Sequence, residues 1–516
     1  MQQWMKLGLV CALSGLFGGS AIGCGGTNNP DGGPGNDAGP VDGGGMTCPA
    51  TGVEISGEIT EDTSWSCPLY VLQGNVFVVN NATLTIAAGT EILGETGGSE
   101  AAALIVARGS RLEAVGTAAE PIVFTSGNPD GARTSGDWAG VVLLGSATTN
   151  DGSCANDPNT GTPECEAPGF LEDRVEGIDV ADPRGVYGGT DDASDCGTLR
   201  YVRIEFAGRE LSPDNELNGL TVAGCGSGTE LSYIQVHRGK DDGVEFFGGT
   251  ASMDHVVITG AQDDSLDFDE GWRGNVQFLV IHQYAGLGDR GIEADNLGAD
   301  EDAAPRTDPT LFNVTMIGTT STKAMLLREG MRGTLRNFVI STFGGNVDVN
   351  GRQVDPNAEW PAELSIENTF FFNAGAFQTE DLTDRDAIWT AARAESWGGA
   401  LPATRPATSS GATDFDMITD AALRSMYRSY EDDHYDDDMG FDESAEMMDA
   451  ARNNTFGTDP MIGGASETDP DYVPANNALE GQATPTFGDT TATYAGALEP
   501  GTTAPWTADW TAFPVN

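Results

Sequence analysis

The sequence predicts an all-β fold, a right-handed parallel β-helix, with a small helical and acidic insertion near residues 381–452. Two observations carry this prediction. A short phrase containing paired acids recurs, so that Asp263 follows Asp241 by 22 residues and Asp289 follows Asp263 by 26. Short β-rich runs also alternate with glycine-rich corners, without helices between them. A period of about 22 residues is typical of one solenoid turn, whereas a propeller blade needs a longer repeat.

The chain begins with a segment that is typical of export. Residues 1–23 contain Lys6 as their only base, and the apolar stretch over 7–17 is too short to span a bilayer. We expect a signal peptide here. The following Cys24 completes a Ser-Ala-Ile-Gly-Cys run that resembles the lipobox of bacterial lipoproteins, so the resemblance implies acylation of Cys24. With Gly25 next, it also implies an outer-membrane lipoprotein at the cell surface. An ordinary signal peptide cut nearby is the alternative.

The predicted organisation continues from the lipidated cysteine to the end of the chain. Residues 24–47 are rich in Gly, Asn, Asp and Pro, which predicts a flexible tether. The β-helix is expected over 48–380, interrupted by a disulfide-pinned insertion at 146–197. A helical and acidic insertion over 381–452 and a closing segment over 453–516 follow.

Six cysteines remain after the signal peptide and the lipidated residue are set aside. In an exported protein an even number of cysteines predicts disulfides, and the absence of a CxxC pair disfavours a metal site. Six cysteines allow 15 pairings, and nearest neighbours along the chain suggest one of them. These neighbouring pairs are Cys48 with Cys67, Cys154 with Cys165, and Cys196 with Cys225.

Charge excludes some partners. The chain has 25 Lys and Arg against 79 Asp and Glu, a net charge of −54. Nucleic acid and anionic membrane surfaces are therefore poor partners, and cations are suitable ones.

The β-helix elements follow one another along the chain. Short β-rich runs recur over 76–79, 84–86, 104–106, 121–124 and 138–145. After the insertion the repeat sharpens: residues 246–258 match 268–280, and the Gly-Trp-Arg-Gly run at 271–274 returns as Gly-Met-Arg-Gly at 330–333. Residues 386–395 and 417–430 have helical composition, and 431–442 are densely acidic. We expect these three stretches to form the insertion beside the coil.

Several of these runs together resemble a known family. They are Asn218-Gly219-Leu220, the Asp-Asp-Gly-Val-Glu-Phe-Phe-Gly-Gly run over 241–249, the Gly-Trp-Arg-Gly-Asn run over 271–275, and Tyr-Ala-Gly-Ala over 494–497 before the terminal Trp residues. The chain resembles mostly uncharacterised bacterial cell-surface and lipid-anchored right-handed parallel β-helix proteins over about 70–516. The resemblance implies the fold and carries no activity.

The repeated phrase places its acids in two columns. Alternation along each strand turns Val244 and Phe246 inward and Glu245 outward. Stacked turns lie about 5 Å apart, where a pair of like charges costs about 3 kcal/mol at an intermediate dielectric. Calcium, which takes six to eight oxygen ligands, would neutralise such columns. The predicted ligands are Asp241, Asp263 and Asp289 in one column, and Glu245, Asp267 and Glu293 in the other.

Two alternatives remain open for these acids. Asp side chains at solenoid corners also cap backbone groups, which needs no metal. The other alternative is a polysaccharide lyase or glycoside hydrolase, by analogy with the fold. A hydrolase would use Asp263 and Asp267 as paired carboxylates, and a lyase would use Arg290 or Lys240 to take a proton. We favour a protein that binds glycans or other cell-surface partners without catalysis.

Overall fold

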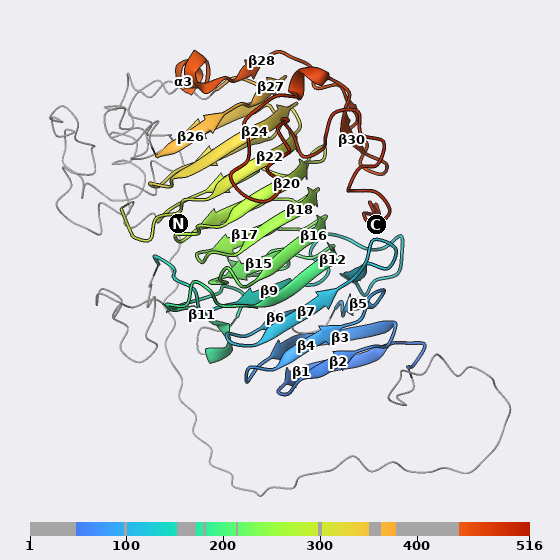
Figure 1. Ribbon diagram of the computed structural model, residues 1–516. Helices are drawn as coiled ribbons and strands as arrows, with labels where there is room; N and C mark the ends of the chain where they lie inside the picture. The colour runs from blue at the N-terminus through green and yellow to red at the C-terminus, as the bar shows by residue number, and fades with distance from the viewer. Residues whose placement is uncertain are drawn as a thin grey trace, which may run out of the picture. The chain divides into compact units, whose positions relative to one another are not determined.

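The computed structural model describes residues 48–97, 101–151, 172–178, 182–212, 215–297, 302–349, 363–377 and 443–516. The chain divides into two units, Met1–Gly39 and Pro40–Asn516. All of the described residues belong to the second unit. Its strands stack turn upon turn in a single 24-stranded sheet, from β1 at one end to β28 at the other (Figure 1). Neighbouring strands of this sheet pair in parallel, which confirms the predicted parallel β-helix.

The first turns contain short strands that begin and end close to the predicted runs. A long strand pairs with two later ones, since the first half of β3 contacts β5 and its second half contacts β6. The strands are β1 (Val53–Ile59), β2 (Thr63–Trp65), β3 (Leu69–Val78), β4 (Thr83–Ile86), β5 (Glu91–Gly94), β6 (Ala103–Val106), β7 (Arg111–Val115), β8 (Ile122–Ser126) and β9 (Gly140–Leu144).

The later turns form two continuous series of strands. The series of longer strands is β12 (Gly197–Glu205), β16 (Glu230–His237), β18 (Ser252–Thr259), β20 (Asn275–His282), β22 (Thr310–Ile317) and β24 (Gly333–Ser341), followed by β26 (Leu364–Glu367), β27 (Phe370–Phe372) and β28 (Thr455–Phe456). The series of shorter strands continues from β9 through β15 (Leu220–Ala223), β17 (Val244–Phe247), β19 (Leu266–Asp269), β21 (Arg290–Ala294), β23 (Lys323–Leu327) and β25 (Gly345–Val349).

A single apolar core fills the coil along its length. Val244 and Phe246 are fully buried in this core, as the alternation predicts. Trp272 is also fully buried and stacks on Phe246 with ring centroids 4.3 Å apart. The glycine of the repeated phrase is required by close packing, because a Cβ on Gly243 would clash with the side chain of Ile258 and lie 2.6 Å from the carbonyl oxygen of Ser265.

The outer surface of the coil is covered on two sides. On one side, Val175, Ile178 and Tyr187 of the 146–197 insertion pack on outward-facing apolar residues of the early turns. The described part of this insertion contains an antiparallel pair, β10 (Glu172–Arg174) and β11 (Val186–Gly188), joined through the short helix η1 (Pro183–Gly185). A second small hairpin, β13 (Glu210–Ser212) and β14 (Asn215–Glu216), precedes β15.

The C-terminal segment covers the other side by running back along the coil. It starts after β28 and contains β29 (Ile462–Gly464), β30 (Asp471–Pro474) and the short helix η6 (Asn477–Leu479). Its backbone amide at Gly496 donates to Asn337 of β24, while the carbonyl of Ala512 accepts from Gln235 of β16. The final residue, Asn516, accepts a hydrogen bond from the amide of Gly131. The predicted closing segment is therefore a strap along many turns, not a cap on one end.

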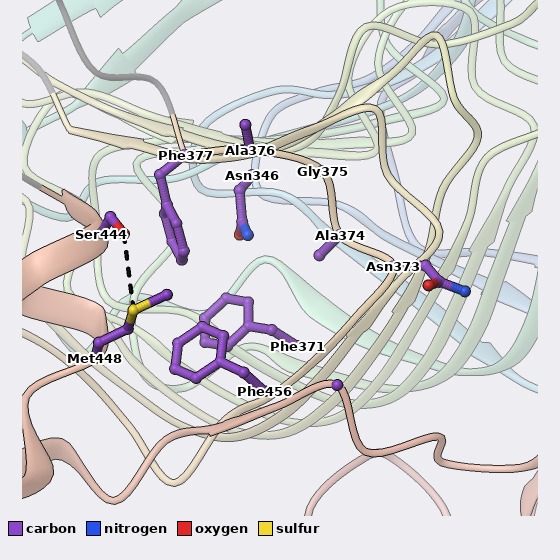
Figure 2. A pocket seen from close by; sticks show the side chains of 11 residues that line it. Asn346, Phe371, Asn373, Ala374, Gly375, Ala376, Phe377, Ser444, Met448 and Phe456 are labelled. Atoms are coloured by element: carbon purple, nitrogen blue, oxygen red, sulfur yellow. Dashed lines mark hydrogen bonds between the residues drawn. The ribbon is translucent and has the colours of Figure 1, made fainter.

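The far end of the coil carries a cavity of about 500 Å³ (Figure 2). Phe371 of β27 stacks on Phe456 of β28 with ring centroids 4.9 Å apart, and Phe377 meets both rings edge-on. The helix α3 (Glu443–Met447) and the short helix η5 (Ala450–Arg452) are the described helical parts of the predicted 381–452 insertion. The helices expected over 386–395 and 417–430 lie outside the described residues.

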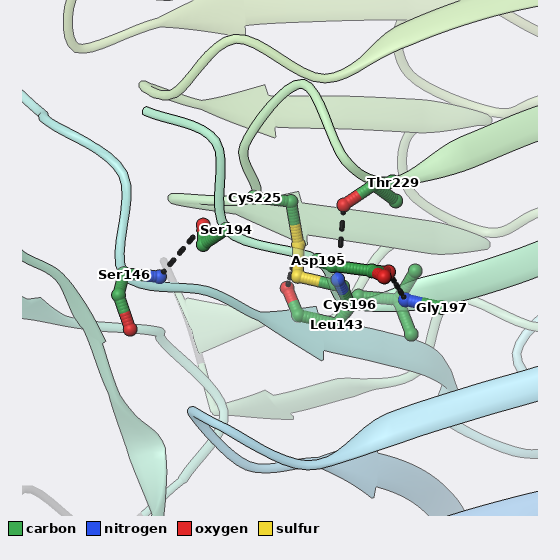
Figure 3. The surroundings of a disulfide bond; sticks show 8 residues. All are labelled: Leu143, Ser146, Ser194, Asp195, Cys196, Gly197, Cys225 and Thr229. Carbon is green, nitrogen blue, oxygen red and sulfur yellow. Dashed lines mark hydrogen bonds between the residues drawn. A yellow bond between two sulfur atoms is a disulfide. The ribbon is translucent and has the colours of Figure 1, made fainter. Parts of the chain in front are cut away.

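Two of the suggested disulfides are present. Cys48 bonds to Cys67, and Cys196 bonds to Cys225. The second bond joins the end of the 146–197 insertion to the turn after β15 (Figure 3). Next to it, the amide of Cys196 donates to the hydroxyl of Thr229 at 3.0 Å. The suggested pair of Cys154 and Cys165 lies outside the described residues, as do Cys24, the predicted signal peptide and the predicted tether.

Candidate cation site

The register of three neighbouring strands brings one predicted column together. Glu245 of β17 pairs with Asp267 of β19, and Asp267 pairs with Glu293 of β21. The column ends at Leu326, which pairs with Glu293 on the next turn. On the preceding turn its neighbour is Thr221, so the carboxylates occupy three consecutive turns.

The other predicted column lies at the corner before these strands. Asp289 donates its amide to the carbonyl of Asp263, which places these two residues on adjacent turns. Asp241 belongs to a group with Asp242 and Asp263 whose carboxylate oxygens all lie within 4.8 Å of one another. A second such group contains Asp263, Asp264 and Asp289. The two columns therefore form one continuous acidic cluster.

Asp242 and Asp264, which were not among the predicted ligands, link the two columns. Asp242 Oδ1 accepts a hydrogen bond from the amide of Asp264 at 2.8 Å, and Asp264 Oδ1 accepts one from the amide of Arg290 at 2.6 Å. These bonds are the corner capping that the first alternative describes. The second Asp of each pair performs it, and the doubled Asp in the sequence was the available signal.

The linking residues also complete two compact groups of oxygens. Asp242, Glu245 and Asp267 bring carboxylate oxygens within 4.8 Å of one another, and so do Asp264, Asp267 and Glu293. Asp267 belongs to both groups and therefore lies at the centre of the cluster.

Burial and mutual repulsion favour the protonated form of several of these acids. Burial, followed by the charges of Asp267 and neighbouring acids, raises the pKa of Asp242 and of Glu245 well above its usual range. Burial and the charge of Glu293 raise the pKa of Asp264 and of Asp267 in the same way. A cation that neutralised the cluster would therefore compete with protons.

Among the described residues, arginines form ion pairs with the acids of the last turn of the cluster. Burial alone would raise the pKa of Glu293, but a hydrogen bond from Asp264 and the guanidinium groups of Arg328 and Arg290 hold it below its ordinary value. Arg290 Nη1 lies 3.1 Å from Glu293, and Arg328 Nη2 lies 2.5 Å from it. Within the described part of the chain, no ion pair involves Asp242, Glu245 or Asp267.

The acids point away from the apolar core, as predicted, yet polar side chains cover part of the cluster. Glu245 is 9% exposed, and its carboxylate accepts a hydrogen bond from Asn218 Nδ2. Further along, Tyr187 and Thr149 donate to Glu270 at 2.7 and 2.9 Å. The insertion and the loop before β15 therefore cover part of this face. The alternation of residues along each strand does not reveal this covering.

The residues that the catalytic alternative requires lie in different environments. Asp263 is exposed whereas Asp267 is partly buried, and burial raises the pKa of each. Arg290, the candidate proton acceptor, is held in ion pairs with Asp289 and Glu293. The other candidate, Lys240, packs its side chain against Gly136.

The fold and this cluster define a class, a parallel β-helix protein with stacked carboxylates on an outer face. The family profile described as a pectate-lyase-like β-helix domain matches residues 57–404. The chain therefore belongs to the family of pectate-lyase-like β-helix domains, which confirms the parallel β-helix resemblance. No curated protein and no solved structure matches it. Among the described residues, no helix is long and apolar enough to cross a membrane.

Proposed function

We propose that this chain is a lipid-anchored β-helix protein of the cell surface that holds calcium in its acidic cluster and binds glycans without catalysis. One observation carries the calcium assignment: Asp242, Glu245 and Asp267 bring carboxylate oxygens together where no arginine or lysine among the described residues pairs with them. Like charges so placed need protons or a cation.

The donor set fits a hard divalent cation. Calcium takes six to eight oxygen ligands in flexible geometry, and carboxylates from adjacent turns supply several of them. Asn218 offers another, because it is 1% exposed and its Oδ1 accepts no hydrogen bond. Rotation of the amide exchanges its oxygen and nitrogen, so the side chain that now donates to Glu245 can present an oxygen instead.

Metal analysis and chelation test the calcium assignment. We expect calcium to co-purify with the protein, and we expect exhaustive chelation to lower the Tm reversibly. Magnesium should restore the Tm less well than calcium, because it demands near-ideal octahedral geometry and dehydrates reluctantly. An unchanged Tm after chelation, with no metal bound, would leave corner capping as the role of these acids.

The anchor is proposed from the sequence around Cys24. Acylation there would attach the protein through its lipid chains, and residues 24–47 would separate the β-helix from the outer membrane. Labelling cells with a fatty-acid probe tests this. The native protein should take up the label and fractionate with the outer membrane, and a Cys24→Ala variant that still labels would refute it.

The family description favours one alternative, a polysaccharide lyase or glycoside hydrolase acting along the acidic face. A degradation screen on acidic and neutral polysaccharides separates the two functions. Turnover that disappears in Asp263→Asn or Arg290→Ala, while the fold is retained, would establish the enzyme and overturn the binding-only proposal. We expect no turnover, because the guanidinium of Arg290 is held by two carboxylates.

A further inference from the structure

A groove lies on a different face from the acidic cluster, where three long strands begin beside the C-terminal strap. Its volume is about 450 Å³, within the range of about 300–1,000 Å³ that is usual for ligand pockets. The starts of β16, β18 and β20 form its floor, and residues 487–489 form one wall. The groove therefore requires both the coil and the strap.

A column of closely packed rings supports the floor. Tyr233, His255 and Phe278 occupy equivalent positions on successive turns, each with a positive φ between 53° and 61°. The ring of His255 lies 4.4 Å from Tyr233 and 4.7 Å from Phe278, and Trp506 of the strap meets it edge-on at 5.1 Å. His255 Nδ1 also hydrogen-bonds to Asp254. Packing on three sides fixes the position of the imidazole.

The wall is fixed by hydrogen bonds from the floor. Gln277 accepts from the amide of Asp489 at 2.8 Å and donates to its carbonyl at 3.0 Å. The neighbouring Phe487 packs edge-on against Phe312 with ring centroids 5.9 Å apart and remains partly exposed. An apolar ring face and several polar groups thus border the same space.

The charge of the groove selects among ligands. Glu230, Asp254 and Asp489 line it, and no lysine or arginine does. Hydrogen bonds from the side chain and amide of Thr491 lower the pKa of Asp489, so this carboxylate stays ionised. Carboxylates accept hydrogen bonds from hydroxyl and ammonium groups and repel other carboxylates. A uronate would therefore be disfavoured here.

We propose that this groove binds a glycan segment made of neutral or amino sugars, with Phe487 against a sugar ring and Asp254 and Glu230 accepting hydrogen bonds from its hydroxyl or amino groups. This inference rests on the proposed glycan-binding function and names its site and ligand class. It also separates sugar binding from the acidic cluster, because the two occupy different strands.

Calorimetric titration of the full chain with three defined oligosaccharides tests the inference. The probes are a neutral gluco-oligosaccharide, a glucosamine oligosaccharide and an oligogalacturonate. We expect the first or second to bind and the third not to bind. Phe487→Ala and Asp254→Asn should weaken binding at least tenfold. The matched control is Phe456→Ala at the far-end cavity, which should leave the affinity for the oligosaccharide unchanged.

Each outcome decides the matter. If an oligosaccharide binds and both groove variants bind it equally well, the groove is not the site, although glycan binding stands. Preference for the oligogalacturonate would overturn the assignment of ligand class. If none of the three binds, the glycan function and the groove inference fail together. Should Asp254→Asn not fold, Phe487→Ala decides, because this side chain lies on the strap and is partly exposed.

Discussion

Replacing Asp267 by asparagine is expected to stabilise the metal-free protein and to weaken its calcium binding. Asp267 has Glu245 on one side and Glu293 on the other, each one strand away. The charge of Glu293 is balanced by Arg290 and Arg328, whereas no basic partner among the described residues balances Glu245. The repulsion that the substitution relieves is therefore mainly that between Glu245 and Asp267.

The size of the effect follows from the spacing of strands. Neighbouring strands lie about 4.8 Å apart, so one like-charge pair costs about 3 kcal/mol at an effective dielectric of about 20. One kcal/mol shifts Tm by about 2–4 °C in domains of 150–250 residues and by less in longer chains. At pH 8 with a chelator, we expect Asp267→Asn to raise the Tm by about 3–6 °C.

Calcium should stabilise the native protein more than the Asp267→Asn variant and so reverse the order of their Tm values. The variant lacks a carboxylate that belongs to two of the oxygen groups, so we expect at least a tenfold loss of calcium affinity and a smaller rise in Tm on adding the ion. The control is Glu113→Gln, an outward-facing carboxylate of β7 paired with Arg111 at 3.2 Å, which should change neither value. An Asp267→Asn protein that melts at or below the native Tm in chelator, with native calcium affinity, would refute the reasoning.

Further predictions concern pH, the core and the covering segments. In chelator, the Tm should fall as the pH rises above 4.5, the higher of the ordinary pKa values of Asp242 and Glu245. Burial raises both pKa values, so the folded form binds more protons than the unfolded form above that pH. Calcium should flatten this profile, and a Tm that rises with pH in chelator would contradict it. Trp272→Ala should lower the free energy of unfolding, measured with denaturant, by about 3–5 kcal/mol, because the fully buried ring stacks on Phe246 in the core. A loss below 1 kcal/mol would show that the core is not packed as described. Cys196→Ser with Cys225→Ser should expose the 146–197 insertion to limited proteolysis before the coil itself is cut, and an unchanged cleavage pattern would show that this disulfide does not hold the insertion.

Local repetition explains how much of the site the sequence could predict. A period near 22 residues sets which residues stack, so Glu245, Asp267 and Glu293 were predicted as one column, and their register confirms it. Alternation likewise predicted that Val244 faces the core. These features depend only on strand geometry and turn length, which neighbouring residues determine.

Histidine positions show where local alignment is insufficient. The strand register places His237 and His282 in one column, separated by Thr259, and the repeated phrases of the sequence do not reveal this. Both are buried, and burial lowers the pKa of His237 to about 3 and that of His282 to about 4. His237 contacts the hydroxyl of Thr259 and the carbonyl of Pro514 of the strap, so this column serves packing of the C-terminal segment.

The sequence by itself determined the coil, its inward-facing apolar residues and the columns of acids, because each follows from a repeat read along a few turns. Tertiary structure alone decided what covers the coil. It placed Tyr187 over the acidic face. It also brought Phe487 into the same groove as Gln277, although the two residues are more than 200 positions apart in the sequence. Such contacts join segments that share no repeat, and only their packing against the finished coil brings them together. The environment of the acids, and therefore their protonation, depends on that packing.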